Sequence, residues 1–209
     1  MTSIDLDFKD LDLESMPDLG RQSFGVVCLH AGSDSGTWYR NQLSALAATA
    51  WDAPPDAALR GNGDAPFAQW VEAYAAHLRS TGNLPANVVA CGQAAMGAML
   101  LAAEHPELVT SLVLGDPEVD VASDLFIQTV GRIRTPSLVI VAAPERTTDI
   151  SDAQGIAGGI ANGVFVIIDD CAVPAHHHKP SSFNEWTSSF IRIAEGLHAF
   201  GHPQEENNA

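Results

Sequence analysis

The sequence predicts an α/β fold in which a central, mostly parallel sheet carries helices on both faces. Short apolar runs flanked by Gly, Pro or Asp are typical of strands, and they occur at 25–30, 87–91, 111–116, 137–143 and 164–169. Segments with helical periodicity alternate with them, at 35–48, 64–80, 93–104, 152–161 and 181–198. This alternation is typical of a parallel sheet covered on both sides.

The strand-like runs contain almost no polar residues. "GVVCLH" (25–30), "NVVAC" (87–91) and "SLVLGD" (111–116) come first, followed by "SLVIVAA" (137–143) and "VFVIID" (164–169). A strand with one face in water would alternate apolar and polar residues, so we expect both faces of these strands to be buried.

The helical segments 64–80 and 181–198 each have one apolar stripe. In the first, the spacing i, i+3, i+4, i+7, i+8, i+11 is held by Phe67, Trp70, Val71, Tyr74, Ala75 and Leu78. In the second, the apolar face consists of Phe183, Trp186, Phe190, Ile193, Ala194 and Leu197. Such stripes predict helices that pack against the sheet.

The length of 209 residues and a hydrophobic content of 46% favour one domain, which we expect to span 1–200. The alternating acidic start at 5–20 is compatible with an antiparallel hairpin at one edge of the sheet. The tail 201–209 has no apolar anchor, so it is predicted to be disordered.

The composition excludes several classes of partner. A net charge of −16 would repel nucleic acid and anionic membrane surfaces. No stretch approaches the roughly 20 apolar residues of a membrane span, and the acidic start is unlike a secretory signal, so we expect a cytoplasmic protein. Three cysteines without metal-type spacing predict neither a disulfide framework nor a metal site, and no cofactor is expected.

Several motifs then occur in one order. They are "LHAGSDSGTW" after the first buried strand, "LRGNGDAP" (59–66), the segment ending in "EHPELVTSLVLGDP" (104–117), and "TPSLVIVAAPE" (135–145). In this order they resemble the α/β-hydrolase superfamily from residue 25 to 198. The short distance between "GDP" and "RTPSL" implies that the family's helical cap is absent or minimal.

The resemblance implies a nucleophile elbow within "VVACGQAAMG" (88–97), a sharp strand-to-helix turn with the pattern GxSxG. Counting back from "EHPE" places that pattern on 90–94, with Gly92 at the nucleophile position. Ala90 and Ala94 meet its need for small residues, and an alternative register that puts Ala94 at the nucleophile also supplies no hydroxyl. Cys91 could act only if the turn shifted by one residue, so a structural thiol is favoured there.

The resemblance also implies a catalytic histidine and an acid, and only the acid positions carry a matching residue type. Alignment on Pro180 and Phe183 puts Val173 at the histidine position, although an insertion of three residues could bring His176 there. Adjacent histidines point in different directions, so a solvated loop is the simpler interpretation of 176–178. Glu145 lies near the expected acid, and Asp116 occupies a second acid location known in the family.

The expected oxyanion donors need no particular side chain, since backbone N–H groups supply them. The resemblance assigns them to Ala31 or Gly32 together with Gln93. With the hydroxyl lost, three functions remain open: binding of a small acyl, lactone or aromatic ligand; a lyase, isomerase or cyclase that uses His176 with Glu145 or Asp116; and an ester or thioester hydrolase that uses Cys91 or a carboxylate-activated water. The partner would be a small molecule, with a protein partner or a homo-oligomer left open.

Overall fold

The computed structural model describes residues 24–52, 65–82 and 84–201. The predicted hairpin at 5–20, the "RGNGD" segment at 60–64 and the tail from 202 to 209 lie outside the described residues. Gly201, the first residue of the predicted tail, is the last residue of a helix.

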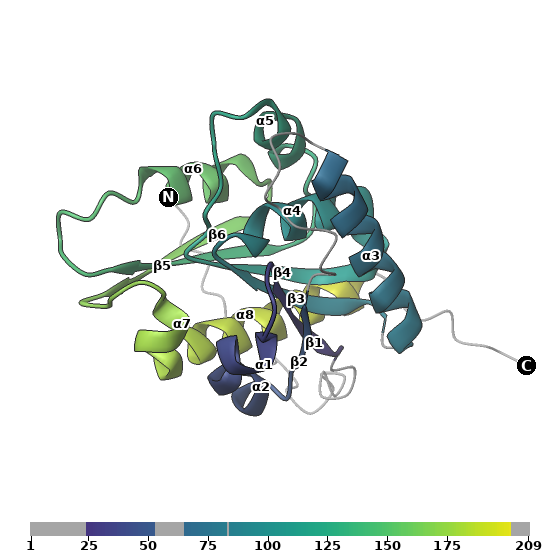
Figure 1. Ribbon diagram of the computed structural model, residues 1–209, viewed down its shortest axis with the longest axis horizontal. Helices are drawn as coiled ribbons and strands as arrows, with labels where there is room; N and C mark the ends of the chain where they lie inside the picture. Colours follow the sequence, from purple (N-terminus) through teal and green to yellow (C-terminus); the bar gives the residue numbers. More distant parts are fainter. Residues whose placement is uncertain (1–23, 53–64, 83, 202–209) are drawn as a thin grey trace, which may run out of the picture.

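The centre of the fold is a sheet of six strands in the order β2-β1-β3-β4-β5-β6 (Figure 1). Every neighbouring pair is parallel, which confirms the predicted sheet. Its strands are β1 (Val26–His30), β2 (Thr49–Asp52), β3 (Ala86–Cys91), β4 (Val109–Gly115), β5 (Ser137–Ala143) and β6 (Gly163–Asp169). All carboxyl ends therefore meet at one edge, where ligands bind in sheets of this kind.

The five predicted strands are present, with bounds that shift by up to two residues. Strand β2 (Thr49–Asp52) was not predicted. Its four residues are exposed or half-buried at the edge of the sheet, so they do not form the continuous apolar run that marks a buried strand.

Helices cover both faces of the sheet, as the sequence predicts (Figure 1). One face carries α3 (Ala65–Thr81), α4 (Ala94–Glu104), α5 (Asp124–Val130) and α6 (Ser151–Gly159). The other carries α1 (Ser35–Trp38), α2 (Arg40–Ala45), α7 (Ala175–His178) and α8 (Pro180–Gly201). A short 3₁₀ helix, η2 (Pro106–Leu108), joins α4 to β4.

The helices of the structure differ from the prediction in three ways. The segment 35–48 forms two short helices, α1 and α2, that meet at Tyr39, where the backbone leaves the helical conformation. Helix α5 was not predicted. The histidine run was expected to be a solvated loop, but it forms the one-turn helix α7.

The core has one apolar cluster on each face of the sheet. Helices α3 and α4 pack closely on the first face, where Gly97 of α4 lies against the Trp70 ring. The second cluster gathers Tyr39, Cys91, Ala175 and Phe183 beneath α1, α7 and α8. Because Cys91 ends β3, this second cluster reaches the carboxyl edge of the sheet.

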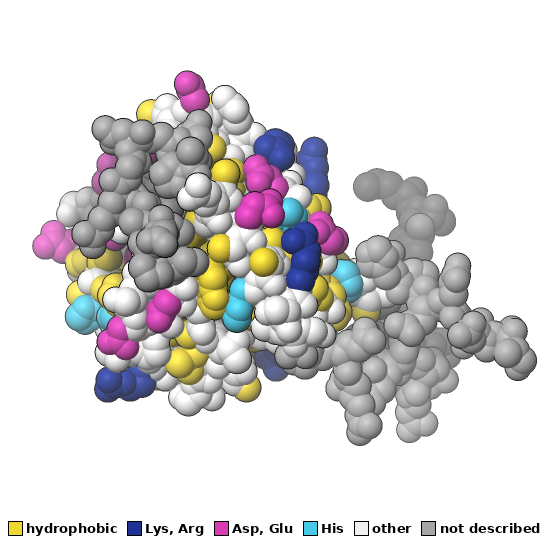
Figure 2. All heavy atoms as spheres, turned by 45° about the vertical axis from the view of Figure 1, so that its right-hand side comes forward, with side chains coloured by type: hydrophobic (Ala, Val, Ile, Leu, Met, Phe, Trp, Pro, Cys, Tyr) yellow, Lys and Arg dark blue, Asp and Glu magenta, His cyan; other side chains and the backbone are white. Residues whose placement is uncertain are grey.

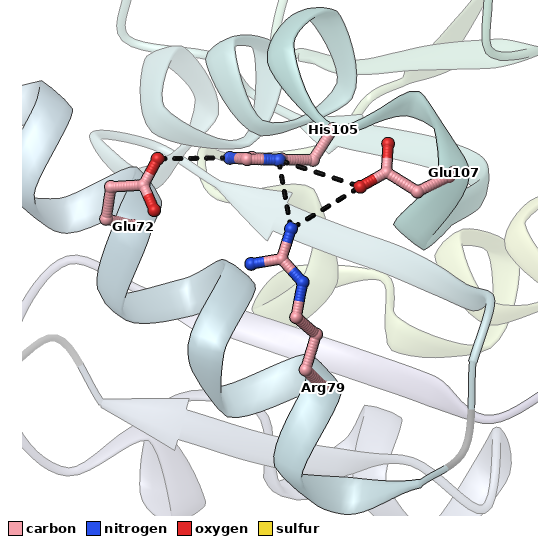
Figure 3. A network of polar contacts seen from close by, with 4 residues as sticks. All are labelled: Glu72, Arg79, His105 and Glu107. Atoms are coloured by element: carbon pink, nitrogen blue, oxygen red, sulfur yellow. Dashed lines mark hydrogen bonds and ion pairs between the residues drawn. The ribbon is translucent and has the colours of Figure 1, made fainter.

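A polar network ties α3 to η2 on the surface (Figure 3). The Arg79 guanidinium lies 3.4 Å from a Glu107 carboxylate oxygen, and His105 Nε2 lies 3.3 Å from Glu72 Oε1. Figure 2 shows acidic, basic and histidine side chains next to one another on this side of the molecule. Its charged partners Glu72, Arg79 and Glu107 are exposed and only His105 is partly buried, so we expect the network to contribute little to stability.

No helix within the described ranges is both long enough and apolar enough to cross a membrane. Between β4 and β5 the chain adds only α5, a helix of seven residues. The described part of the chain thus has no large cap inserted at this point.

Candidate functional site

The predicted strand-to-helix turn is present between β3 and α4. Strand β3 ends at Cys91, Gly92 and Gln93 form the turn, and α4 begins at Ala94. Gly92 has φ +61°, a left-handed conformation that glycine adopts without the steric penalty of a side chain. Ala90 and Ala94 are fully buried, in agreement with the need for small residues beside the turn.

Two backbone hydrogen bonds join the loop after β4 to this turn. The Gly92 N–H donates to the Gly115 carbonyl at 3.0 Å, and the Glu118 N–H donates to the Gly92 carbonyl at 3.1 Å. A Cβ atom on residue 92 would lie 3.4 Å from Glu118 Oε1, an ordinary van der Waals contact. A side chain on residue 92 would therefore be bordered by a carboxylate.

Cys91 faces the core beneath the turn. Its thiol is buried, and a Cβ on Gly115 would approach both its Sγ and the Phe183 ring. Burial raises the pKa of the Cys91 thiol well above its usual value. A protonated, enclosed thiol is a poor nucleophile, since reactivity belongs to the thiolate.

Tyr39 links the first loop to the turn. This fully buried side chain donates its hydroxyl hydrogen to the Leu29 carbonyl at 2.9 Å and accepts the Cys91 N–H at 2.9 Å. Its ring also lies 5.5 Å from the His176 ring, centroid to centroid. Tyr39 thereby holds β1, β3 and α7 together at the carboxyl edge.

His176 is fully buried, and neither ring nitrogen has a hydrogen-bond partner among the described residues. Aromatic rings surround it, with Trp38 at 5.1 Å and Phe183 at 5.8 Å. Burial is the main cause that lowers the pKa of His176 to about 3, and His177 and His30 act in the same direction. The imidazole is therefore neutral at pH 7.

The other histidines of α7 are exposed, although the His177 ring lies 4.2 Å from the His176 ring, centroid to centroid. His177 is exposed and its Nε2 lies 2.8 Å from the Trp38 carbonyl oxygen, whereas His178 is exposed on the surface. The expectation that the three would not line one pocket agrees with this geometry. Val173 precedes α7 and is 57% exposed, so it lies at the surface.

The candidate acids have different surroundings. Glu145 is exposed after β5, where its N–H donates to Thr148 Oγ1 at 3.1 Å. Since the His176 nitrogens have no partner among the described residues, the structure does not join Glu145 to His176 by a hydrogen bond.

Asp116 joins two elements through its carboxylate. It accepts the Ala142 N–H at 2.7 Å and the Ala175 N–H at 2.6 Å, which ties the end of β5 to the start of α7. Burial raises the pKa of Asp116, although both N–H donors act in the opposite direction. Because both of its oxygens accept backbone N–H groups, this carboxylate holds β5 and α7 together.

The loop with the expected oxyanion donors lies beside the turn. Leu29 of β1 pairs with Ala90 of β3, so Ala31 and Gly32 leave the sheet next to Gly92 and Gln93. Gln93 makes no side-chain cap, and the first N–H groups of a helix have no partner within it. The two loops that carry the expected donors are therefore neighbours at one edge of the sheet.

Burial lowers the pKa of His30, whose ring stacks on Trp38 with centroids 5.3 Å apart. The His30 carbonyl accepts the Tyr74 hydroxyl hydrogen at 3.1 Å. These contacts agree with a structural rather than a catalytic histidine.

The described ranges contain no group of three His, Cys, Asp or Glu side chains that could hold a metal ion.

Sequence reasoning did not single out Glu118, Trp38 or Tyr39. Trp38 and Tyr39 follow "HAGSDSGT", and Glu118 directly follows "GDP", so all three come shortly after strands that end at the ligand-binding edge. Their positions in the sequence could have identified them as candidate site residues. The direction of each side chain depends on packing that the sequence pattern does not reveal.

Comparison with solved structures agrees with this architecture, although no family model and no curated protein sequence matches the chain. A serine hydrolase involved in carbazole degradation superimposes with a TM-score of 0.65 at 15% identity, covering 82% of this chain and 92% of the other. A serine hydrolase from Cycloclasticus zankles gives 0.64 at 15%, covering 81% and 90%. An α/β-hydrolase enzyme from a sediment metagenome of the Mar Chica lagoon gives 0.64 at 11%, covering 82% and 92%.

These similarities extend over most of each chain, including the six-stranded parallel sheet. The chain therefore has the α/β-hydrolase fold, as the motif order predicts. At these identities the comparison concerns the fold, and the chemistry must be argued from the site itself.

Proposed function

We propose that this chain is an atypical α/β-hydrolase-fold protein that binds a small acyl, lactone or aromatic ligand over the Gly92 turn and performs no serine-histidine catalysis. The observation that carries the proposal is Gly92 itself, at φ +61° in a strand-turn-helix unit without a hydroxyl. The elbow retains its shape, while the group that would attack a substrate is absent.

The surroundings of the turn support ligand binding. The neighbouring loop at Ala31 and Gly32 and the start of α4 bring backbone N–H groups to one edge. Such donors favour a carbonyl oxygen in a ligand as they would in a substrate. A small-molecule partner is accordingly part of the proposal, and the net charge of −16 argues against nucleic acid or membrane in that role.

The alternatives receive less support from the geometry. An acid-base enzyme built on His176 would rely on an imidazole with a pKa of about 3, a weak base far from neutral pH. A thiol enzyme built on Cys91 would require ionisation of a buried group whose pKa is raised. Loss of the serine or the histidine from a triad costs on the order of 10⁶ in kcat, so serine-type turnover should be negligible.

Two measurements test the proposal. A serine-directed fluorophosphonate should not label the protein, and robust labelling would contradict the absence of a serine nucleophile. Thermal-shift screening against short acyl esters, lactones and aromatic acids should reveal a ligand that raises the Tm. The absence of any stabilising ligand across these classes would count against binding.

A matched pair of variants assigns the binding to the turn. Gly92→Leu fills the space over the elbow and should abolish the ligand-induced rise in Tm. Gly82→Leu introduces the same residue at φ +69° with open space around it, so it carries a similar backbone penalty away from the site. The ligand should still raise the Tm of Gly82→Leu. If both variants lose the ligand-induced rise in Tm equally, the ligand does not bind at the Gly92 turn.

A further inference from the structure

The carboxylate of Glu118 borders the space that a nucleophile side chain would fill. Glu118 Oε1 lies 3.4 Å and Cδ lies 3.8 Å from the position of a Cβ on residue 92. The backbone hydrogen bond from Glu118 to the Gly92 carbonyl fixes the start of this side chain relative to the turn. The closeness of the Glu118 carboxylate to residue 92 therefore depends on this backbone hydrogen bond as well as on the Glu118 side-chain rotamer.

Among the residues that the structure describes, nothing competes for the same carboxylate. It is exposed, and it forms no hydrogen bond or ion pair with any residue in the described part of the chain. Asp116, two residues earlier, differs because both its oxygens accept backbone N–H groups. Of these two carboxylates, Glu118 is the one that is available to accept a proton.

Gly92 leaves room for a water molecule where a hydroxyl would otherwise stand. Apart from the two chain neighbours of Gly92, the only atoms of the described residues within 4 Å of a Cβ at residue 92 belong to the Glu118 carboxylate, so a water beside Gly92 would have this carboxylate as its neighbour. The backbone donors near Gln93 and Ala31 lie at the same edge, next to where a ligand carbonyl would sit. A carboxylate and the two loops expected to supply oxyanion donors thus lie at the same edge of the sheet.

We propose that Glu118 acts as a general base that activates this water toward a small ester or lactone, without a covalent intermediate. Glu118 takes one proton from the water while the water oxygen bonds to the acyl carbon. The bond from that carbon to the leaving oxygen then breaks, and the alkoxide receives the proton from Glu118. One ester and one water give one acid and one alcohol, and the carboxylate is regenerated.

This inference rests on the proposed function, because the ester must first bind over the turn. It predicts slow turnover, since an oxyanion hole and binding alone give roughly 10³ to 10⁴ over water. A positioned general base contributes typically 10² to 10⁴ of rate acceleration. We therefore expect Glu118→Gln to lower turnover by about 100-fold or more.

The experiment follows release of p-nitrophenolate from p-nitrophenyl acetate by the purified full-length chain. Turnover should resist a fluorophosphonate and should fall in Glu118→Gln and Glu118→Ala. Sodium formate should restore part of the rate in Glu118→Ala, because it supplies a carboxylate in the vacated volume. Glu104→Gln, which removes the same charge at the far end of α4, should turn over like the wild type.

Binding is measured separately with 4-nitroacetanilide, the amide analogue, by thermal shift. Unchanged turnover in Glu118→Gln, or a failure of formate to restore any rate to Glu118→Ala, would overturn the role of Glu118. Stabilisation by the amide without any turnover of the ester would overturn the hydrolytic inference and leave the proposed ligand binding intact. If neither amide nor ester interacts with the protein, both proposals are contradicted for this class of ligand.

Discussion

His176 shows how burial changes the chemistry of a single residue. The side chain is fully buried among aromatic rings, and both ring nitrogens lack partners among the described residues. An unpaired polar group inside a protein lowers stability, and a charged one would lower it far more. The neutral imidazole is therefore strongly favoured in the folded state.

This predicts a definite pH dependence of stability. An unfolded histidine has a pKa near 6.5, whereas burial lowers the folded value of His176 to about 3. Below pH 6.5 the unfolded chain binds a proton that the folded chain does not, so stability is lost as the pH falls toward 3. Between pH 6.5 and 5 the loss from this residue should be about 2 kcal/mol.

Urea unfolding at pH 7 and pH 5 measures this effect. His176→Phe keeps an aromatic ring of similar size, and it should lose less stability than the wild type over this interval. His178→Gln is the control at an exposed position of the same helix, and it should retain the wild-type pH dependence. An identical pH dependence in His176→Phe and the wild type would contradict the argument.

At the scale of elements, α3 and α4 depend on a glycine for their close contact. A Cβ atom on Gly97 would overlap the six-membered ring of Trp70, which is fully buried between the two helices. Glycine weakens a helix interior by roughly 1 kcal/mol relative to alanine, so its presence here requires a packing reason. That reason is the space needed by the Trp70 ring.

We predict that Gly97→Ala lowers the free energy of unfolding by about 1 to 3 kcal/mol through overpacking. Gly155→Ala is the matched control, since Gly155 lies in α6 with open space around it. The control should be neutral or stabilising by up to about 1 kcal/mol. Chemical denaturation of both variants checks this, and a Gly97→Ala protein as stable as the wild type would contradict the packing argument.

At the scale of the whole molecule, charge limits the partners. The chain carries 26 acidic residues and 10 Lys or Arg, which gives the net charge of −16. A phosphate backbone is repelled by such a protein at low salt, where screening is weakest. Only a concentrated basic patch would offset this long-range repulsion.

We therefore expect no binding to fluorescein-labelled duplex DNA in anisotropy titrations at low ionic strength. A basic DNA-binding domain of similar size serves as the positive control. A salt-sensitive rise in anisotropy with this protein would reveal a basic surface and contradict the prediction. The same titration with heparin extends the test to other polyanions.

Much of the fold could be predicted because its signals are local. Apolar runs such as 137–143 and the apolar stripe of 64–80 identify strands and helices through spacing alone. Strand β2 was not predicted, because its four exposed or half-buried residues show no such spacing. The histidine run likewise gave no sign that His176 would turn into the core while His178 stays outside.

The sequence by itself determined the fold class, the place of the strand-to-helix turn and the absence of a hydroxyl at Gly92, because these depend on residue identity and local spacing. Only the tertiary structure decided that Glu118 borders the vacant space, that Glu145 and His176 are not joined by a hydrogen bond, and that Asp116 holds α7. The physical reason is that these relations join segments distant in sequence. Their side-chain directions are set by packing between strands and helices, and no local pattern encodes them.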